Sequence, residues 1–151
     1  GVAVIKVGAQ TEVAMKELGI LNDAVNEILK ITLDAFVTND NEAAKRIEPL
    51  EETVDDLVRI LRDRHTKRLK KGACAVSSGL VFMAALTYFE RAADQCSSIA
   101  VMMLARNNEA ILHNHYEYLR VLHSGNDAFY RNEMDLRRDQ YIRPLKDLDV
   151  N

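Results

Sequence analysis

Residues 79–103 read GLVFMAALTYFERAADQCSSIAVMM, and this stretch decides the fold. Apolar side chains recur in it at spacings of three and four residues, which is the period of one face of an α-helix. No proline interrupts the pattern. The stretch therefore predicts a long helix with a broad apolar face that packs against other helices. The side chains of this face are Leu80, Phe82, Met83, Leu86, Phe89, Ala93, Ile99 and Met103.

The same period predicts two long helices before this stretch. They span about residues 11–37 and 41–71, and the polar residues 38–41 between them can cap the second helix. The third helix begins after Ser77 and Ser78 and continues to about residue 107. The inward side chains expected from the first two helices are Val13, Leu18, Leu21, Val25, Ile28, Leu29, Phe36, Ile47, Leu50, Val54, Leu57, Leu61 and either His65 or Leu69.

Two residues are expected to bend and to end the second predicted helix. Pro49 lacks a backbone N–H and its ring clashes with the preceding turn, so we expect a kink around residues 45–49. Gly72 is typical of the position just after a helix end.

After residue 107 the helical pattern is weaker. It predicts a helix over 109–123, a turn at 124–126, and a final helix over 127–142 that ends before Pro144. Long helices with short connections favour antiparallel neighbours. The sequence thus predicts an all-α, up-down antiparallel bundle of three long helices plus shorter C-terminal helices.

Composition limits the class of protein. The chain has 151 residues, 48% of them apolar and 28% charged, which fits one globular domain. A net charge of −3 argues against a general nucleic-acid binder. Cys74 and Cys96 have no CxxC spacing, so we expect buried thiols in a reduced, intracellular setting. No run reaches the ~20 apolar residues of a membrane span, and no signal peptide is recognisable. Because the chain begins with Gly1, we expect a fragment of a longer protein.

Two acidic pairs are the main candidates for a functional site. Glu51 and Asp55 lie in one predicted helix, and Glu90 and Asp94 lie in the next. Residues four apart share a helix face, so each pair presents two carboxylates on one side. If the two faces meet, four carboxylates form an oxygen cage suited to hard or borderline cations. The alternative is that both pairs are ordinary solvated surface.

Residues 62–100 read RDRHTKRLKKGACAVSSGLVFMAALTYFERAADQCSSIA, which resembles the PhoU-like domain at the C-terminus of bacterial sodium/phosphate cotransporters. The segment from Glu90 to Ala100 is the most specific part. Upstream, Glu51-x-x-Val54-Asp55-x-Leu57 is similar to the first acidic motif of that family. Downstream, the Glu117–Arg120 and Leu122–Gly125 stretches resemble its tail. The resemblance covers about residues 10–143, which we expect to be the domain, with an extended arm or linker at 1–9 and a tail at 144–151.

The resemblance implies a PhoU-type bundle that regulates phosphate uptake and is not an enzyme. It implies a cytoplasmic domain at the inner face of the cell membrane, with a membrane-embedded phosphate transporter portion or phosphate-signalling proteins as partners. It also implies metal binding through the ExxxD motifs, at Glu51, Asp55, Glu90 and Asp94. Many relatives carry His directly after the second Asp, where this chain has Gln95. An oxygen-only set favours iron, manganese or magnesium over zinc.

Other interpretations of the sequence remain open. A free-standing PhoU-type phosphate-signalling regulator fits the same residues. A ferritin-like di-iron protein needs Glu-x-x-His pairs, which the chain lacks. His113, His115 and Glu117 fit ordinary polar surface better than a metal site. The basic residues within 59–71 are best explained by their favourable position at the negative end of the helix dipole. The alternative is that they contact an anionic membrane surface.

A second, local resemblance concerns residues 1–17, GVAVIKVGAQTEVAMKE. They are similar to a strand-turn-helix segment of the bacterial chaperonin large subunit. The segment includes none of the nucleotide-binding parts of that protein, so it carries no functional expectation.

Overall fold

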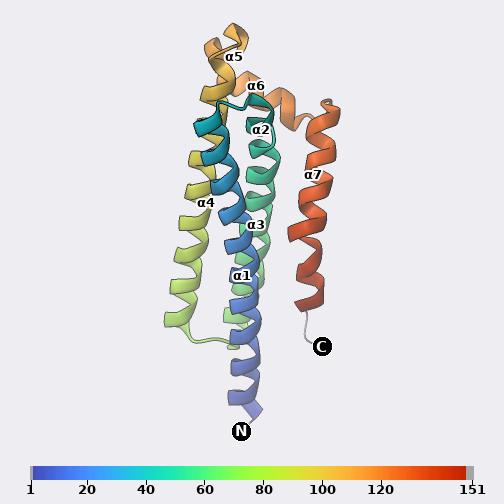
Figure 1. Ribbon diagram of the computed structural model, residues 1–151. Helices are drawn as coiled ribbons and strands as arrows, with labels where there is room; N and C mark the ends of the chain where they lie inside the picture. The colour runs from blue at the N-terminus through green and yellow to red at the C-terminus, as the bar shows by residue number, and fades with distance from the viewer. Residues whose placement is uncertain (1, 149–151) are drawn as a thin grey trace.

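Three long helices lie side by side and form the body of the molecule (Figure 1). The computed structural model describes residues 2–148, and the side chains of residues 11–148. The long helices are α1 (Val2–Thr38), α3 (Ile47–Lys70) and α4 (Val76–Ala105). They run up, down and up, so the predicted all-α antiparallel bundle is confirmed.

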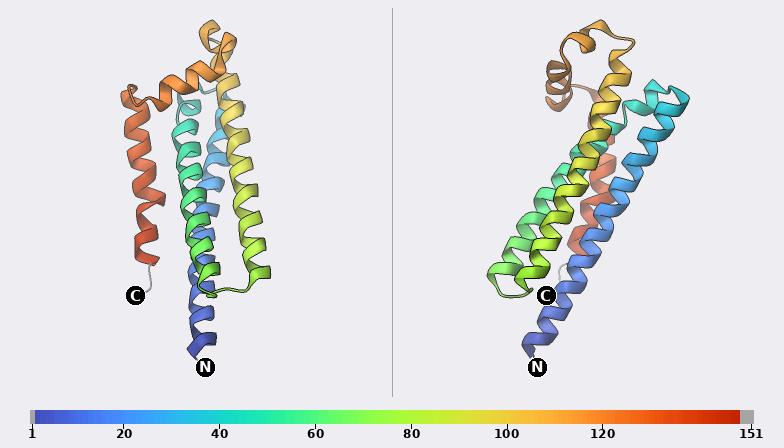
Figure 2. Two further views of the ribbon diagram at one scale, coloured as in Figure 1. Left: turned by 180° about the vertical axis from the view of Figure 1, so that it is seen from behind. Right: turned by 90° about the vertical axis from the view of Figure 1, so that its left-hand side faces the viewer.

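A fourth helix completes the body. The chain leaves α4 through α5 (Glu109–His113) and α6 (His115–His123), which cross the top of the bundle. It then descends as α7 (Ala128–Tyr141) and ends in the 3₁₀ helix η1 (Arg143–Leu148). Figures 1 and 2 show α4 and α7 on opposite sides of the α1–α3 pair. α7 packs mainly against α3 and also contacts α1, whereas in the described part no fourth helix lies on the groove between α1 and α4.

The structure differs from the prediction at the N-terminus. The sequence predicts an extended arm or linker over residues 1–9, but α1 begins at Val2, so residues 2–9 are helical. Adding turns to an existing helix avoids the cost of nucleation, and no proline lies in this segment. At the other end, residues 144–148 of the expected tail belong to η1, and residues 149–151 lie outside the described part.

Pro49 coincides with an interruption of the second predicted helix. The segment 41–71 forms two helices, α2 (Asn41–Ala44) and α3, separated by a turn at Lys45 and Arg46. The ring of Pro49 would clash with the carbonyl of Lys45 in a continuous helix. Since Pro49 lies in the first turn of α3, its missing N–H removes no helical hydrogen bond. The predicted kink around residues 45–49 is thus found as a turn that divides the expected helix in two.

The remaining helix breaks occur at asparagine and glycine residues. The predicted helix 109–123 is divided at Asn114, whose side chain accepts a hydrogen bond of 3.0 Å from the backbone N–H of Glu117. An Asn side chain competes in this way for backbone donors that a continuous helix would use. Gly72 and Gly125 have φ angles of 64° and 82°, which glycine adopts without steric cost and which end α3 and α6.

The core lies between α1, α3 and α4. Leu21, Ile28, Leu50, Leu57 and Leu86 are fully buried in it. Three side chains that the sequence placed inward are exposed instead: Leu29, Phe36 (58% exposed) and Leu80 (68%). The apolar pattern of α1 and α4 is wider than the surface that the bundle itself covers. In the described part, no helix is long and apolar enough to span a bilayer.

A buried ion-pair network fastens α1 to the far end of α3. Glu17 is inaccessible to solvent, and its carboxylate accepts two hydrogen bonds, of 2.8 and 2.7 Å, from the guanidinium of Arg68. Arg64 adds a third at 2.6 Å. A bidentate pair of this kind is geometrically specific. Arg68 also contacts Nδ1 of His65, whose ring stacks on Phe82 with centroids 4.1 Å apart.

Candidate functional site

A ladder of acidic side chains runs along α3. Glu48, Glu51, Glu52, Asp55 and Asp56 follow one another at spacings of three and four, which places them on one side of the helix. Glu48 and Glu51 are buried, and the other three are half-buried. The ladder follows directly on Pro49 and the break before it, at the end of α3 near α6 (Figure 1).

Asp94 of the second predicted ExxxD pair approaches the first pair across α3 and α4. The Glu51 carboxyl group is hydrogen-bonded to Asp94 of α4 and to Asp55 on its own helix. Asp55 also experiences the charges of Asp94 and Glu90. Glu90 is half-buried and Asp94 is exposed, so the cluster opens to solvent on the α4 side. Asp94 thus lies beside the first pair, whereas the groups of described residues whose ligand atoms all lie within 4.8 Å of one another include neither Asp94 nor Glu90, so a site shared by all four acids stays a prediction.

Burial and mutual repulsion perturb these acids strongly. Burial, followed by the charges of Glu48 and Asp55 and the hydrogen bond with Asp94, raises the pKa of Glu51 to about 11. Burial raises the pKa of Asp55 to about 6, although its hydrogen bond with Glu51 acts in the opposite direction. These are the two ordinary causes of a raised carboxyl pKa, desolvation and nearby like charge.

Glu51 has no cationic partner in the described part of the chain. It is only 5% exposed, and no arginine, lysine or histidine forms an ion pair with it. A carboxylate buried among other carboxylates must either hold a proton or face a cation from outside the chain. This residue is the strongest indication that the cluster suits a bound metal ion.

A second group adjoins the first and includes a histidine. Ligand atoms of Glu48, Glu52 and His123 lie within 4.8 Å of one another, as do those of Glu51, Glu52 and Asp55. His123 Nε2 is 2.9 Å from Glu48 Oε1 and 3.4 Å from Glu52 Oε1. Ser97 of α4 donates its hydroxyl proton to the other oxygen of Glu48. Glu52 belongs to both groups, so the two are contiguous.

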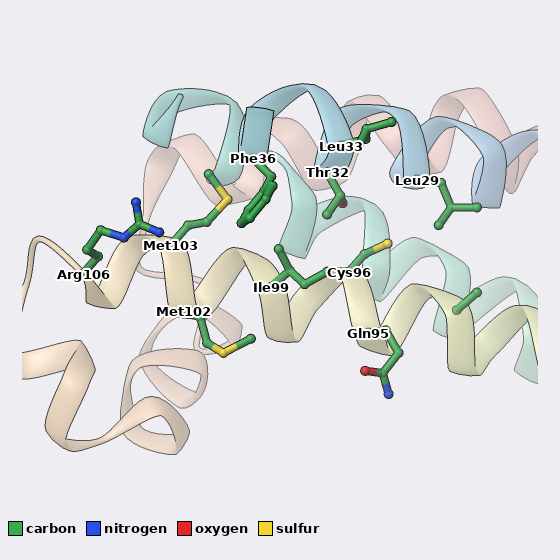
Figure 3. Close-up of a pocket in the computed structure, with 11 residues that line it drawn as sticks. Leu29, Thr32, Leu33, Phe36, Gln95, Cys96, Ile99, Met102, Met103 and Arg106 are labelled. Carbon is green, nitrogen blue, oxygen red and sulfur yellow. The ribbon is translucent and has the colours of Figure 1, made fainter. Parts of the chain in front are cut away.

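The donor set is therefore broader than the sequence predicts. The absence of His after Asp94 indicates oxygen ligands alone, but the last residue of α6 brings an imidazole to Glu48. Gln95 lies at the edge of the groove between α1 and α4, and Figure 3 shows its side chain pointing away from α1. Carboxylates with one imidazole suit borderline cations such as manganese and iron(II), and do not disfavour zinc as an oxygen-only set does.

Sequence reasoning missed Glu48, Glu52, Ser97 and His123. A signal for the first two was present, because Glu48, Glu52 and Asp56 repeat the four-residue spacing beside the Glu51–Asp55 pair. No local pattern could have found His123. Its position depends on the path of α5 and α6 over the top of the bundle.

The other sequence candidates lie elsewhere. His113, His115 and Glu117 are exposed, and Glu117 pairs with Arg120 on its own helix, so they form ordinary polar surface. Cys96 is buried and Cys74 is half-buried, both as free thiols. The basic run has Lys67, Arg68 and Lys70 in the last turn of α3, where they complement the helix dipole. Arg64 and Arg68 also bind the buried Glu17, which the sequence did not indicate.

The fold and site define an antiparallel helical bundle with a shared acidic cluster on two adjacent helices. Comparison with known protein families identifies the family of this chain. The model of the PhoU domain matches residues 18–103. This is more than half of the chain, so the chain belongs to the PhoU family. The matched segment contains both ExxxD pairs, while His123 lies beyond it. No curated protein and no solved structure matched the chain. The more specific likeness to cotransporters and the likeness to a chaperonin segment stay predictions.

Proposed function

We propose that this PhoU domain regulates phosphate transport and that its regulatory state depends on a metal ion held between α3 and α4. The family is regulatory and linked to phosphate transport, which agrees with the expectation that the chain is not an enzyme. The observation that carries the proposal is the burial of Glu51 against Asp94 and Asp55 without a cationic partner among the described residues.

Glu51, Asp55, Glu90 and Asp94 would hold the ion, and Glu48, Glu52 and His123 extend the donor set toward α6. A divalent cation would remove the repulsion among the acids on the two helices. Binding would therefore tighten the contact between α3 and α4. Loss of the ion would loosen the contact between α3 and α4, unless protonation of the carboxyl groups removes their repulsion instead. Such a two-state contact is what a regulatory domain needs, because a partner can bind one state better than the other.

Within phosphate transport, we place the domain after a sodium-coupled permease, on the cytoplasmic side of the membrane. The support is the resemblance of residues 62–100 to the domain found there. A free-standing PhoU regulator is the alternative. The ferritin-like di-iron interpretation loses support, because His123 is the one histidine that the described structure brings to the acidic cluster.

The test replaces Glu51→Gln in the native gene and measures uptake of labelled phosphate after growth in phosphate-rich and phosphate-poor medium. We expect uptake in the variant to lose its dependence on the growth condition. Glu109→Gln, which removes an exposed acid on α5, should regulate as the wild type does. Normal regulation in the Glu51 variant would contradict the proposal. Repeating the assay without sodium separates the two contexts, because only a sodium-coupled permease loses the regulated uptake.

A further inference from the structure

The thiol of Cys74 lies beside a buried histidine, in the loop that joins α3 to α4. Its Sγ atom is 3.8 Å from Nε2 of His65, and this histidine is only 3% exposed. Cys74 is a half-buried free thiol, so it is not sealed from solvent as the histidine is. A thiol and an imidazole within hydrogen-bond reach are the core of an activated cysteine, provided that a third group orients the imidazole.

Arg68 determines where the His65 ring carries its proton. The Nε–H group of Arg68 donates to Nδ1 of His65 at 3.1 Å, and a guanidinium cannot accept a hydrogen bond. Nδ1 therefore carries no proton. Burial, followed by the positive charge of Arg68, lowers the pKa of His65 against the smaller opposing effect of Glu17, so the ring is neutral at pH 7. The single proton of a neutral imidazole must then lie on Nε2, which faces the sulfur of Cys74.

A chain of polar contacts holds the imidazole in this orientation. Arg68 is only 6% exposed, and its two terminal nitrogens donate to the two carboxylate oxygens of Glu17 at 2.8 and 2.7 Å. The ring of Phe82 stacks on His65 with centroids 4.1 Å apart. The groups that orient the imidazole are thus themselves fixed. Because His65 presents an N–H donor to the sulfur, it acts as a hydrogen-bond donor to a thiolate and not as a general base.

The charges around the loop suit an anionic sulfur. No aspartate or glutamate occurs from residue 64 to residue 89, a segment that contains the end of α3, the loop and the first part of α4. Glu17 of α1 reaches this end of α3, but Arg64 and Arg68 already pair with it. α4 begins two residues after Cys74 and has no acid in its first turn. Cationic neighbours, helix N-termini and N–H donors all favour the thiolate, which is the nucleophilic form of cysteine.

An intramolecular disulfide is not available to this thiol. Cys96 is the other cysteine of the chain, and it lies 20 residues after the first residue of α4. That separation corresponds to about 30 Å along the helix axis. A disulfide requires Cα atoms within about 7 Å of each other. Oxidation of Cys74 must therefore use a reactant from outside the chain.

We infer that Cys74 is a site of reversible oxidation by hydrogen peroxide. The thiolate sulfur attacks one peroxide oxygen, so that an S–O bond forms and the O–O bond breaks. Sulfur is oxidised by two electrons to the sulfenic acid, and the other oxygen leaves as hydroxide, which a proton from solvent converts to water. The oxidant must be small, because packing around Nε2 of His65 is so tight that a Cβ on Gly79 would lie 3.1 Å from it.

A dithiol reverses this oxidation. One of its sulfurs condenses with the sulfenic acid and releases water, and its second sulfur then displaces the mixed disulfide and restores the thiol of Cys74. The inference is independent of the acidic cluster between α3 and α4, which contains neither Cys74 nor His65.

The test measures the rate at which Cys74 of the full chain reacts with hydrogen peroxide at pH 7. Dimedone traps the sulfenic acid, and mass spectrometry of proteolytic peptides locates the adduct. The reference is a synthetic peptide of residues 70–78, which keeps the neighbouring lysines and lacks His65. We expect Cys74 in the folded chain to react at least about tenfold faster than in the peptide, whereas burial alone predicts a slower reaction. Dithiothreitol added before dimedone should abolish the adduct.

Histidine variants separate activation of the thiol from packing around it. His65→Leu should slow the oxidation of Cys74 about tenfold, because the donor is lost. If the ring only filled space, its replacement would expose the sulfur and speed the reaction. His113→Leu alters an exposed histidine on α5 and should react as the wild type does. Circular dichroism checks folding, and the comparison with the peptide decides the matter if His65→Leu does not fold.

Three results would overturn the inference. The first is a wild-type rate no higher than that of the peptide. The second is a folded His65→Leu chain that reacts as fast as the wild type or faster. The third is an adduct on Cys96 alone, since that thiol is 2% exposed and should not react in the folded chain.

Discussion

The carboxyl group of Glu51 on α3 is buried beside Asp94 of α4, and burial is the largest of the causes that raise the pKa of Glu51 to about 11. Neighbouring carboxyl groups repel each other unless one of them holds a proton. In the absence of a cation, the raised pKa of Glu51 therefore favours a proton at this point between the two helices. A metal ion would replace that proton, so the state of this single contact depends on both pH and metal concentration.

The metal-free protein should lose stability as pH rises above about 4. The folded-state pKa values of Glu51 (about 11) and Asp55 (about 6) exceed the ordinary values of 4.5 and 3.8. Between these limits the folded chain binds more protons than the unfolded chain, so the free energy of unfolding falls with rising pH. Glu51→Gln should flatten this dependence and stabilise the protein at pH 8 by at least about 1 kcal/mol. Urea denaturation with a chelator present, at pH 5 and pH 8, measures both effects. Equal pH dependence in the two proteins would contradict the raised pKa of Glu51.

Metal should reverse this trend. Manganese(II) or iron(II) is expected to raise the melting temperature of the wild type more at pH 8 than at pH 5, since the ligands must lose their protons to bind. Glu51→Gln and Asp94→Asn should reduce both the shift in melting temperature and the metal content found by elemental analysis. Glu109→Gln serves as the control on an exposed acid. Equal metal content in all four proteins would reject the site.

Much of this site could be predicted because helical spacing is local information. The four-residue interval in Glu51–Asp55 and Glu90–Asp94 is enough to place each pair on a shared helix face. That Asp94 approaches Glu51 depends on the packing of α4 against α3. The position of His123 could not be predicted. Its approach to Glu48 depends on the break at Asn114 and on the path of α6, which begins after that break.

The errors in the core have a different physical cause. Apolar periodicity identifies Leu29, Phe36 and Leu80 as apolar positions, but it does not indicate what covers them. The bundle covers only part of the apolar surface of α1 and α4. The ion-pair partner of Arg68 could not be predicted either, because Glu17 lies 51 residues away in the sequence. Contacts over such separations follow from the assembled fold and not from a local pattern.

The ion pair between Glu17 and Arg68 yields a prediction about stability. Glu17→Gln leaves the buried guanidinium of Arg68 without a compensating charge, so we expect a loss of about 3–5 kcal/mol in the free energy of unfolding. Glu12→Gln removes an exposed ion pair with Lys16 on the same helix and should change stability by less than about 0.5 kcal/mol. Urea denaturation at pH 7 compares the two. Similar small losses in both variants would show that the buried pair contributes little.

Two glycines in helices should respond oppositely to alanine. A Cβ atom on Gly79 of α4 would lie 2.7 Å from Cδ2 of Leu69 and 3.1 Å from Nε2 of His65, both on α3. Such overpacking costs about 1–3 kcal/mol and outweighs the helix-propensity gain of about 1 kcal/mol, so Gly79→Ala should destabilise the protein. At Gly19 of α1 the new Cβ would meet no described atom within 4 Å other than those of its chain neighbours and its own helix backbone, and Gly19→Ala should stabilise by about 1 kcal/mol. Thermal and urea denaturation measure both. If Gly79→Ala were as stabilising as Gly19→Ala, α3 and α4 could not approach as closely at this crossing as the structure places them.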